Sequence, residues 1–189
     1  WGVNHEIGHV MQMSPQLTWG GMTEVSNNLF TMYVATKAGK PSRLSQSKNY
    51  ENARKNIIEA TEKPFIMCVK DPFEKLVPFW QLHLYAQEKG YADFYADLME
   101  YMRNHPDQGR GNASINNMYE FIKVSCDLLK TDLTDFFEAW GFFVTGTFEV
   151  GDYANYKFDI TPKMIEETKQ YVAGKKYPKP EKDLTLLTD

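Results

Sequence analysis

Cysteine and long apolar stretches are scarce in this sequence of 189 residues. Its two cysteines, Cys68 and Cys126, are too few for a disulfide framework, and their spacing is not that of a metal-binding knuckle. We expect two buried or half-buried thiols, with one structural bridge as the alternative. No stretch approaches the roughly 20 apolar residues that span a bilayer, and the N-terminus has no signal-peptide layout. The sequence therefore predicts no transmembrane segment.

A strong bias toward one sign of charge is also missing. The chain has 21 Lys and Arg against 25 Asp and Glu, for a net charge of −4, and the two signs are interspersed. Without a basic stripe or a polybasic run, the charge pattern favours neither nucleic acid nor a lipid surface as a partner. The length fits one domain, and 42% hydrophobic with 24% charged residues is an ordinary globular composition. We expect a single domain over residues 1–189 that binds no nucleic acid.

Helical periodicity fills most of the chain, so we predict a mainly α fold. Apolar residues recur at spacings of three and four, and Asp71 followed by Pro72 is typical of a helix start. Pro78 lies inside that helix and should bend it or end it early. Residues 142–158 predict an extended or hairpin segment, and the tail after residue 173 should be loosely held. The expected helices cover residues 2–13, 22–38, 50–61, 72 onward, 91–103, 116–129, 131–140 and 161–173, with a polar connection over 42–50.

The most informative pattern is His-Glu-Ile-Gly-His at residues 5–9, in the first predicted helix. Residues four apart project from one face of a helix, so His5 and His9 can bind one metal ion from consecutive turns. Glu6 is offset around the helix, so its carboxylate can point at an open coordination position and act as a base. The chain has only four histidines, which makes a chance match rare. The alternative is two ordinary helix-surface histidines with Glu6 in solvent.

Catalytic zinc needs a third protein ligand, and Glu24 is the candidate. It lies on the next predicted helix, after a turn at Gly20 and Gly21 that lets the chain reverse. Two histidines and one glutamate form a thermolysin-type ligand set for Zn²⁺. The alternative is that Glu24 only complements the dipole of a first helical turn. Asn27 and Asn28 follow by three and four positions, so one of them could hold a ligand histidine.

This ligand set predicts hydrolysis of a peptide bond. Zinc polarises the scissile carbonyl and lowers the pKa of water to about 7, while Glu6 takes the proton and passes it to the leaving amine. A further donor is needed near the developing oxyanion. The candidates for this donor are His83, Tyr85 and Tyr153. Each of them is more readily explained as a packing residue.

Five stretches of the sequence then resemble one known family. They are Trp-Gly-Val-Asn-His-Glu-Ile-Gly-His at 1–9, Trp19, Gly-Met-Thr-Glu-Val-Ser-Asn-Asn at 21–28, Pro-Phe-Trp-Gln-Leu-His-Leu-Tyr at 78–85 and Asp-Leu-Thr-Asp-Phe-Phe-Glu-Ala-Trp-Gly at 132–141. Together they resemble the M60 or enhancin-like zinc metallopeptidases of the gluzincin type, over most of residues 1–145. The zinc motif alone fits many peptidase families, whereas the residues after Glu24 and the Phe-Trp-Gln-Leu stretch are more specific.

The resemblance implies a secreted or surface-attached endopeptidase that acts on mucin-like, O-glycosylated proteins. By matching positions it assigns His5, His9 and Glu24 to zinc and Glu6 to the base. It also implies that residues 1–189 form the helical active-site lobe of the catalytic domain. Since the chain starts four residues before the first expected ligand, we expect the upstream wall of the cleft to be absent from it.

Two other functions remain open at this point. One is a non-catalytic module that binds glycoproteins on a peptidase scaffold, which the aromatic content of 14% would serve. Most aromatic residues occur at helical spacing and should be buried, but Trp19, in the loop beside the expected site, is the best candidate for stacking on a sugar. The other is an aminopeptidase-type gluzincin.

Overall fold

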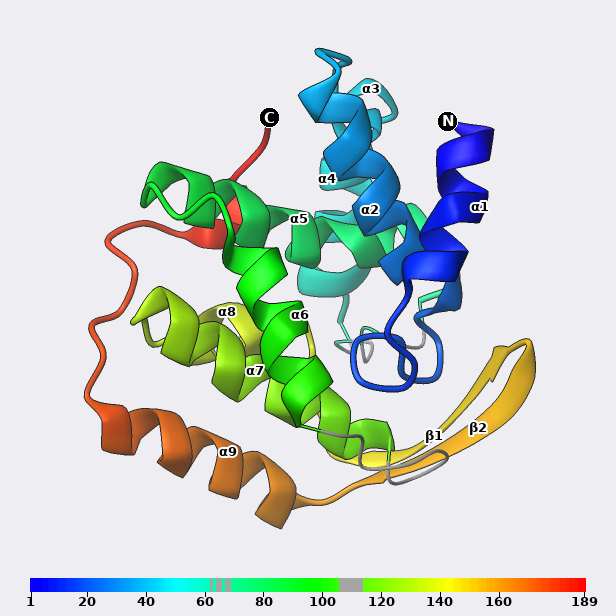
Figure 1. Ribbon diagram of the computed structural model, residues 1–189. Coiled ribbons are helices and arrows are strands. Elements are labelled where there is room, and N and C mark those ends of the chain that lie inside the picture. Colours follow the sequence, from blue (N-terminus) through cyan, green and yellow to red (C-terminus); the bar gives the residue numbers. More distant parts are fainter. Residues whose placement is uncertain (62, 64–65, 67–68, 106–113) are drawn as a thin grey trace.

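The computed structural model describes residues 1–61, 63, 66, 69–105 and 114–189, and these form a mainly α structure with one β-hairpin (Figure 1). The predicted fold class is confirmed. The elements are α1 (Gly2–Met11), α2 (Thr23–Lys37), α3 (Arg43–Gln46), α4 (Asn49–Ala53), the π-helical turn η1 (Arg54–Ile58), α5 (Pro72–Glu88), α6 (Phe94–Asn104), α7 (Ser114–Leu129), α8 (Thr134–Ala139), β1 (Gly146–Asp152), β2 (Ala154–Ile160), α9 (Pro162–Lys175) and the 3₁₀ turn η4 (Leu184–Leu186).

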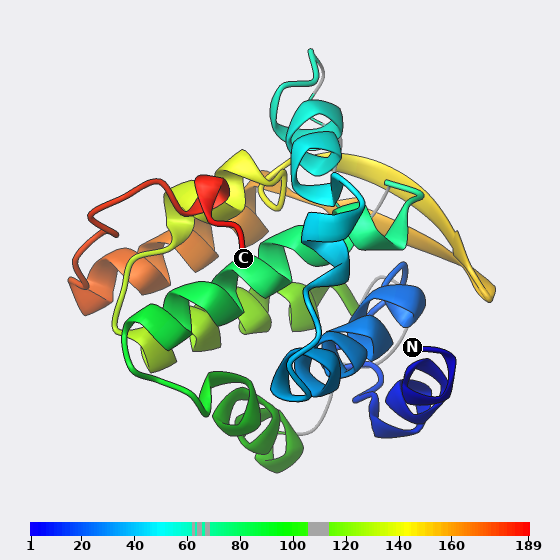
Figure 2. The same cartoon turned by 90° about the horizontal axis from the view of Figure 1, so that it is seen from above.

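Helix α5 runs through the middle of the molecule and packs against α2 and α4 (Figure 2). Its start is as predicted: the Asp71 side chain accepts hydrogen bonds from the backbone of Phe73 and Glu74, and Pro72 occupies the first turn. The helix continues through Pro78 to Glu88, so the expected early end is wrong. Apolar residues of α5 then form the centre of the core; those almost fully buried are Leu76, Val77, Phe79, Trp80, Leu82 and Ala86.

The hairpin of β1 and β2 brings residues 146–160 next to the N-terminal helices (Figure 1). Strands β1 and β2 pair antiparallel, with Phe148 opposite Phe158 and Tyr153 at the turn. The hairpin packs on Gly20: a Cβ there would lie 2.6 Å from the Tyr156 ring, so only glycine allows this approach. The turn of the hairpin therefore lies beside the segment between α1 and α2.

Helix α1 does not bury the apolar residues whose spacing marks it as a helix. Its apolar residues Val3, Ile7, Val10 and Met11 are 54–84% exposed. The opposite side of the helix, with Gly8, packs against α2. Helical periodicity located the helix but not its buried face, because the polar and glycine side makes the contact.

Two further expectations need correction. The polar connection over 42–50 contains α3, because the Ser42 hydroxyl caps its first turn by accepting from Leu44 N. The C-terminal tail is held in place at its end: Leu184 is 2% exposed, and the Asp189 carboxylate accepts hydrogen bonds from Trp80 Nε1 and Tyr50. Of the two cysteines, Cys126 is a buried free thiol whose burial raises its pKa to about 12. Cys68 lies outside the described residues.

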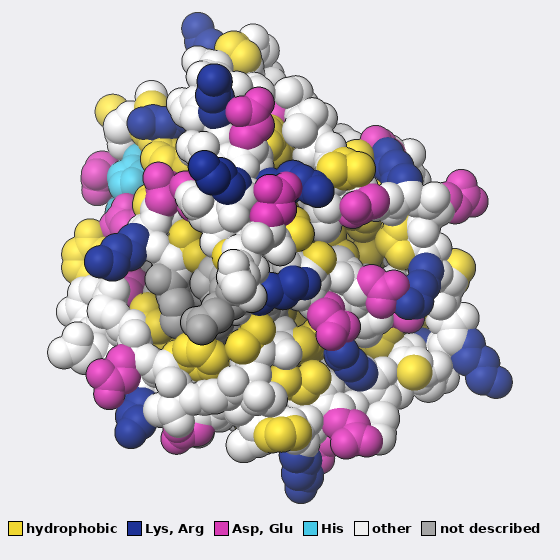
Figure 3. Space-filling view, turned by 180° about the vertical axis from the view of Figure 1, so that it is seen from behind, with side chains coloured by type: hydrophobic (Ala, Val, Ile, Leu, Met, Phe, Trp, Pro, Cys, Tyr) yellow, Lys and Arg dark blue, Asp and Glu magenta, His cyan; other side chains and the backbone are white. Residues whose placement is uncertain are grey.

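The distribution of charged side chains on the surface indicates which partners the protein could bind. In the view from behind, basic and acidic side chains alternate over the face without a continuous patch of either sign (Figure 3). Within the described part of the chain, none of the helices combines the length and apolar character that crossing a bilayer requires.

One buried amide side chain on α5 binds the C-terminal segment. Gln81, 1% exposed, donates from Nε2 to the carbonyl oxygens of Thr185 and Leu187 and accepts at Oε1 from Trp140 Nε1. We predict that Gln81→Leu lowers the free energy of unfolding by about 2–3 kcal/mol, because it leaves these partners without hydrogen bonds. Gln87→Leu, on the exposed end of α5, should change it by less than about 0.5 kcal/mol. Urea unfolding of both variants measures this, and equal stabilities would contradict it.

Candidate metal centre

Helices α1 and α2 bring three of the predicted residues together. His5 Nε2 lies 3.2 Å from Glu24 Oε2, and His9 Nε2 lies 3.6 Å from Glu24 Oε1. One ligand atom from each of the three residues can be chosen so that all lie within 4.8 Å of one another. A tetrahedral zinc site with bonds of about 2.0–2.1 Å separates its ligand atoms by about 3.4 Å. The spacing of the three side chains therefore fits a metal of this kind.

The hydrogen bonds of the two histidines occupy Nδ1 and leave Nε2 of each ring free to bind a metal. His5 Nδ1 lies 2.8 Å from Asn28 Oδ1, and His9 Nδ1 lies 3.0 Å from Gln12 Oε1. Amide oxygens only accept hydrogen bonds, so each Nδ1 carries the proton and each Nε2 keeps its lone pair. This is how ligand histidines are usually held, with the second ring nitrogen donating to a fixed oxygen.

Asn27 gives independent support for the tautomer of His9. Its amide Nδ2 lies 3.0 Å from His9 Nε2, where only an acceptor nitrogen can receive its hydrogen. The same Nδ2 lies 3.2 Å from both ring nitrogens of His5, so it does not distinguish the tautomers of that residue. The Asn27 side chain is fully buried, and its Oδ1 has no hydrogen-bond partner among the described residues. A buried polar group beside two convergent lone pairs points to a site made for a cation. The donor set thus fits the metal that the sequence predicts.

A short network holds Gln12, which the sequence analysis did not single out. Its Nε2 donates to Thr23 O and to the Ser26 hydroxyl, so the side chain bridges the end of α1 and the start of α2. The Ser26 hydroxyl also pairs with Thr18. The only sequence signal was the spacing of three residues between His9 and Gln12, which places them on one helix face.

Close contact between the two helices makes the cluster possible. A Cβ on Gly8 would lie 2.5 Å from the carbonyl oxygen of Asn27, which is nearer than real Cβ atoms come to backbone oxygen. Glycine at this position therefore lets α1 approach α2 closely enough for His5 and His9 to reach Glu24. The glycine between the two histidines is a structural requirement of the site.

Glu6 and Tyr153 lie at the exposed side of the cluster. Glu6 follows His5 on α1 and is exposed. Tyr153, at the turn of the hairpin, donates its hydroxyl to Glu24 Oε1 at 2.8 Å. This hydrogen bond, and then the charges of Glu24, Asp152 and Glu6, raise the pKa of Tyr153 above its usual value. The hydroxyl is therefore held beside the Glu24 carboxylate.

Asp152 fixes the turn of the hairpin to the start of α2. Its Oδ2 accepts hydrogen bonds from Gly21 N at 2.9 Å, Thr23 N at 3.1 Å and the Thr23 hydroxyl at 2.7 Å. The two backbone N–H groups and the hydroxyl lie at or just before the N-terminus of α2, where a carboxylate is favourable. No local pattern relates Asp152 to residues about 130 positions earlier, so the sequence could not identify it.

The structure places three other predicted candidates away from the cluster. Trp19 is 1% exposed and packs against Phe79 and Phe121, so its expected role as an exposed sugar-stacking residue is wrong. His83 is half-buried and stacks on Trp80, and this burial lowers its pKa. Tyr85 pairs with Thr131. His83 and Tyr85 are packing residues, which is the explanation that the sequence favoured.

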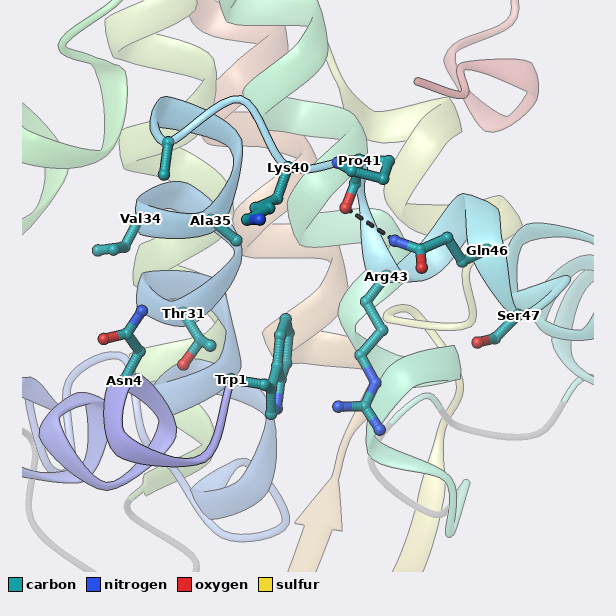
Figure 4. A pocket seen from close by; sticks show the side chains of 11 residues that line it. Trp1, Asn4, Thr31, Val34, Ala35, Lys40, Pro41, Arg43, Gln46 and Ser47 are labelled. Atoms are coloured by element: carbon teal, nitrogen blue, oxygen red, sulfur yellow. Dashed lines mark hydrogen bonds between the residues drawn. The ribbon is translucent and has the colours of Figure 1, made fainter.

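Two cavities border this region. One, of about 450 Å³, opens beside Glu24 between β1 and the starts of α2 and α5; its lining includes Gly21, Val25, Lys75 and Asp152. The other, of about 490 Å³, lies between α1, α2 and α3, and its lining does not include the two histidines or Glu24 (Figure 4). There the Arg43 guanidinium lies 4.7 Å from the Trp1 ring centre. The first cavity is the one that adjoins the candidate metal centre.

Solved structures that are similar to this chain include metallopeptidases. A solved metallopeptidase in complex with Tn antigen matches 100% of this chain at 30% identity, with a TM-score of 0.82, and the match covers 35% of that protein. A metallopeptidase from Bacteroides thetaiotaomicron matches 98% at 30% identity, with a TM-score of 0.77 and 31% coverage. A functionally unknown conserved protein from Bacillus anthracis matches at 28%, with a TM-score of 0.76, over 100% of this chain and 33% of its own. The comparison with curated proteins gave no match.

The fold of the chain is similar to that of solved metallopeptidases, and helices α1 and α2 carry a cluster of possible metal ligands. More specifically, the family model for Peptidase M60, enhancin and enhancin-like proteins matches residues 1–141, so the chain belongs to that family. It spans about a third of the length of the solved relatives that it resembles.

The contact at Gly8 gives a direct test of this packing. We predict that Gly8→Ala lowers the free energy of unfolding by about 1–3 kcal/mol, because α1 must move away from the Asn27 carbonyl. Gly2→Ala is the matched control on the same helix, since a Cβ there has nothing within 4 Å. It should leave stability unchanged or slightly raised. Chemical denaturation measures both, and a Gly8→Ala variant as stable as Gly2→Ala would show that the contact is not close.

Proposed function

We propose that the chain supplies the active-site lobe of a zinc-dependent endopeptidase, formed by residues 1–189. His5, His9 and Glu24 are the zinc ligands and Glu6 is the general base. The observation that carries this proposal is the pair of convergent Nε2 lone pairs facing the Glu24 carboxylate, with both Nδ1 hydrogens engaged by amide oxygens. Surface histidines without a metal would have no need of such fixed orientation.

The chemistry follows from the positions of these side chains. A bound zinc ion would supply Lewis acidity, which polarises a carbonyl and lowers the pKa of water to about 7. Glu6 is not one of the three clustered residues, and its exposed carboxylate is free to accept the proton of an attacking water. It then donates that proton to the leaving amine. Asn28 and Gln12 keep the imidazole rings oriented throughout.

A glycoprotein is the proposed substrate. Support comes from the relative that was solved in complex with Tn antigen. The cavity beside Glu24 has room for a substrate side chain, and its lining mixes apolar Val25 and Val150 with charged Lys70 and Glu149. Mucin-like, O-glycosylated proteins occur outside cells, so we also propose that the protein acts as a secreted or surface-attached enzyme.

Replacing the proposed base tests the mechanism. Glu6→Gln keeps the size of the side chain but cannot accept the proton, so we predict that cleavage of a mucin glycoprotein by the full-length gene product falls by 10² or more. A chelator should abolish cleavage by the wild type, and zinc should restore it. Glu51→Gln, at an exposed position of α4, is the matched control and should cleave like the wild type. Cleavage by Glu6→Gln at the wild-type rate would contradict this mechanism. Binding of the glycoprotein without metal and without cleavage would instead favour a non-catalytic binding module.

The orientation of His5 can be tested through metal binding alone. Asn28→Ala removes the oxygen that holds His5 Nδ1, so we predict a loss of 10–100-fold in zinc affinity. Asn52→Ala, on the exposed side of α4, should bind zinc as the wild type does. Competition with a chromogenic chelator measures both affinities. Unchanged affinity of Asn28→Ala would remove Asn28 from the site.

A further inference from the structure

Tyr153 combines features that a packing residue does not need. Its side chain is 87% exposed, so the ring gains little from burial. Its backbone has φ of 54°, a left-handed conformation that is unfavourable for a tyrosine. Strain of this kind at a residue beside a functional cluster suggests that the position of the side chain matters.

Asp152 fixes the position of the Tyr153 hydroxyl. Asp152, the preceding residue, is held by three hydrogen bonds to Gly21 and Thr23 at the start of α2. Glu24 is the next residue of α2, and the Tyr153 hydroxyl lies 2.8 Å from its Oε1. One anchor therefore aligns the turn of the hairpin with the proposed ligand set.

The donors around the cluster differ in their access to a substrate. The Nδ1 hydrogens of both histidines already bind Asn28 and Gln12. The amide of Asn27 is fully buried beneath the histidines. Glu6 and Glu24, as carboxylates, only accept hydrogen bonds. The Tyr153 hydroxyl is a donor on the exposed side, where a peptide could meet it.

We propose that Tyr153 is a catalytic residue whose hydroxyl donates a hydrogen bond to the oxygen of the scissile carbonyl as negative charge develops on it, and that Asp152 is the residue that positions it. The proton stays on the tyrosine. The inference rests on the proposed peptidase function and adds a donor that the developing oxyanion requires. The Glu24 carboxylate holds the hydroxyl until a substrate is present.

Removing only the hydroxyl tests this role. We expect Tyr153→Phe in the full-length gene product to lower kcat on a mucin-type glycopeptide by about 10²–10³ and to change KM by less than about twofold. Zinc affinity should stay within about twofold of the wild type. Tyr171→Phe is the matched control, because it removes a tyrosine–carboxylate hydrogen bond to Asp127 in another part of the molecule. Its kcat should be unchanged.

A second variant tests the anchor through hydrogen exchange, a readout that needs neither activity nor metal, alongside kcat. Asp152→Asn weakens the acceptor at the start of α2, so we expect faster hydrogen exchange at the backbone amides of Gly21 and Thr23 and a kcat reduced about tenfold. Unchanged exchange and unchanged kcat would overturn the positioning role of Asp152.

The outcomes separate this inference from the proposed function. Wild-type kcat in Tyr153→Phe, together with an inactive Glu6→Gln, overturns the role of Tyr153 alone. A loss of activity in Tyr153→Phe that zinc saturation restores also overturns it, because the hydroxyl would then only hold Glu24 in place. An active Glu6→Gln overturns the proposed function and this inference with it.

Discussion

The close contact between α1 and α2 is the constraint on which the candidate site depends. The two helices approach so closely that only glycine fits at position 8 against the Asn27 carbonyl. This approach lets two histidines from one helix and a glutamate from the next share a space a few ångströms wide. The same contact also holds the Nδ1 atoms of the two histidines, because Asn28 lies on the facing helix and Gln12 at the end of α1. The proposed ligands and the side chains that orient them therefore belong to one packing interface.

The hairpin adds a second, long-range constraint. Its turn is attached to the start of α2 by the Asp152 carboxylate, which brings Tyr153 beside Glu24. Three separate parts of the chain therefore surround the cluster: α1, α2 and the turn between β1 and β2. Helix α5 packs against α2, and Val150, Phe158 and Ile160 of the hairpin join the same hydrophobic core.

The sequence was sufficient where short-range patterns carry the information. Helical periodicity and capping residues predicted most helices, and the four-residue spacing of His5 and His9 predicted their convergence. It was insufficient where burial depends on tertiary packing. The aromatic ring of Trp19 looked available because it lies in a loop, yet that loop folds into the core against Phe79 and Phe121. Likewise, Asp152 joins residues about 130 positions away, a distance over which no periodicity operates.

The central claim is that His5, His9 and Glu24 hold a zinc ion at the α1–α2 interface. Anomalous diffraction at the zinc absorption edge, from crystals of the zinc-loaded protein, tests it most directly. The account predicts a single strong peak at about 2.0–2.2 Å from the Nε2 atoms of His5 and His9 and from the Glu24 carboxylate. Zinc located elsewhere, with these three side chains unligated, would contradict it.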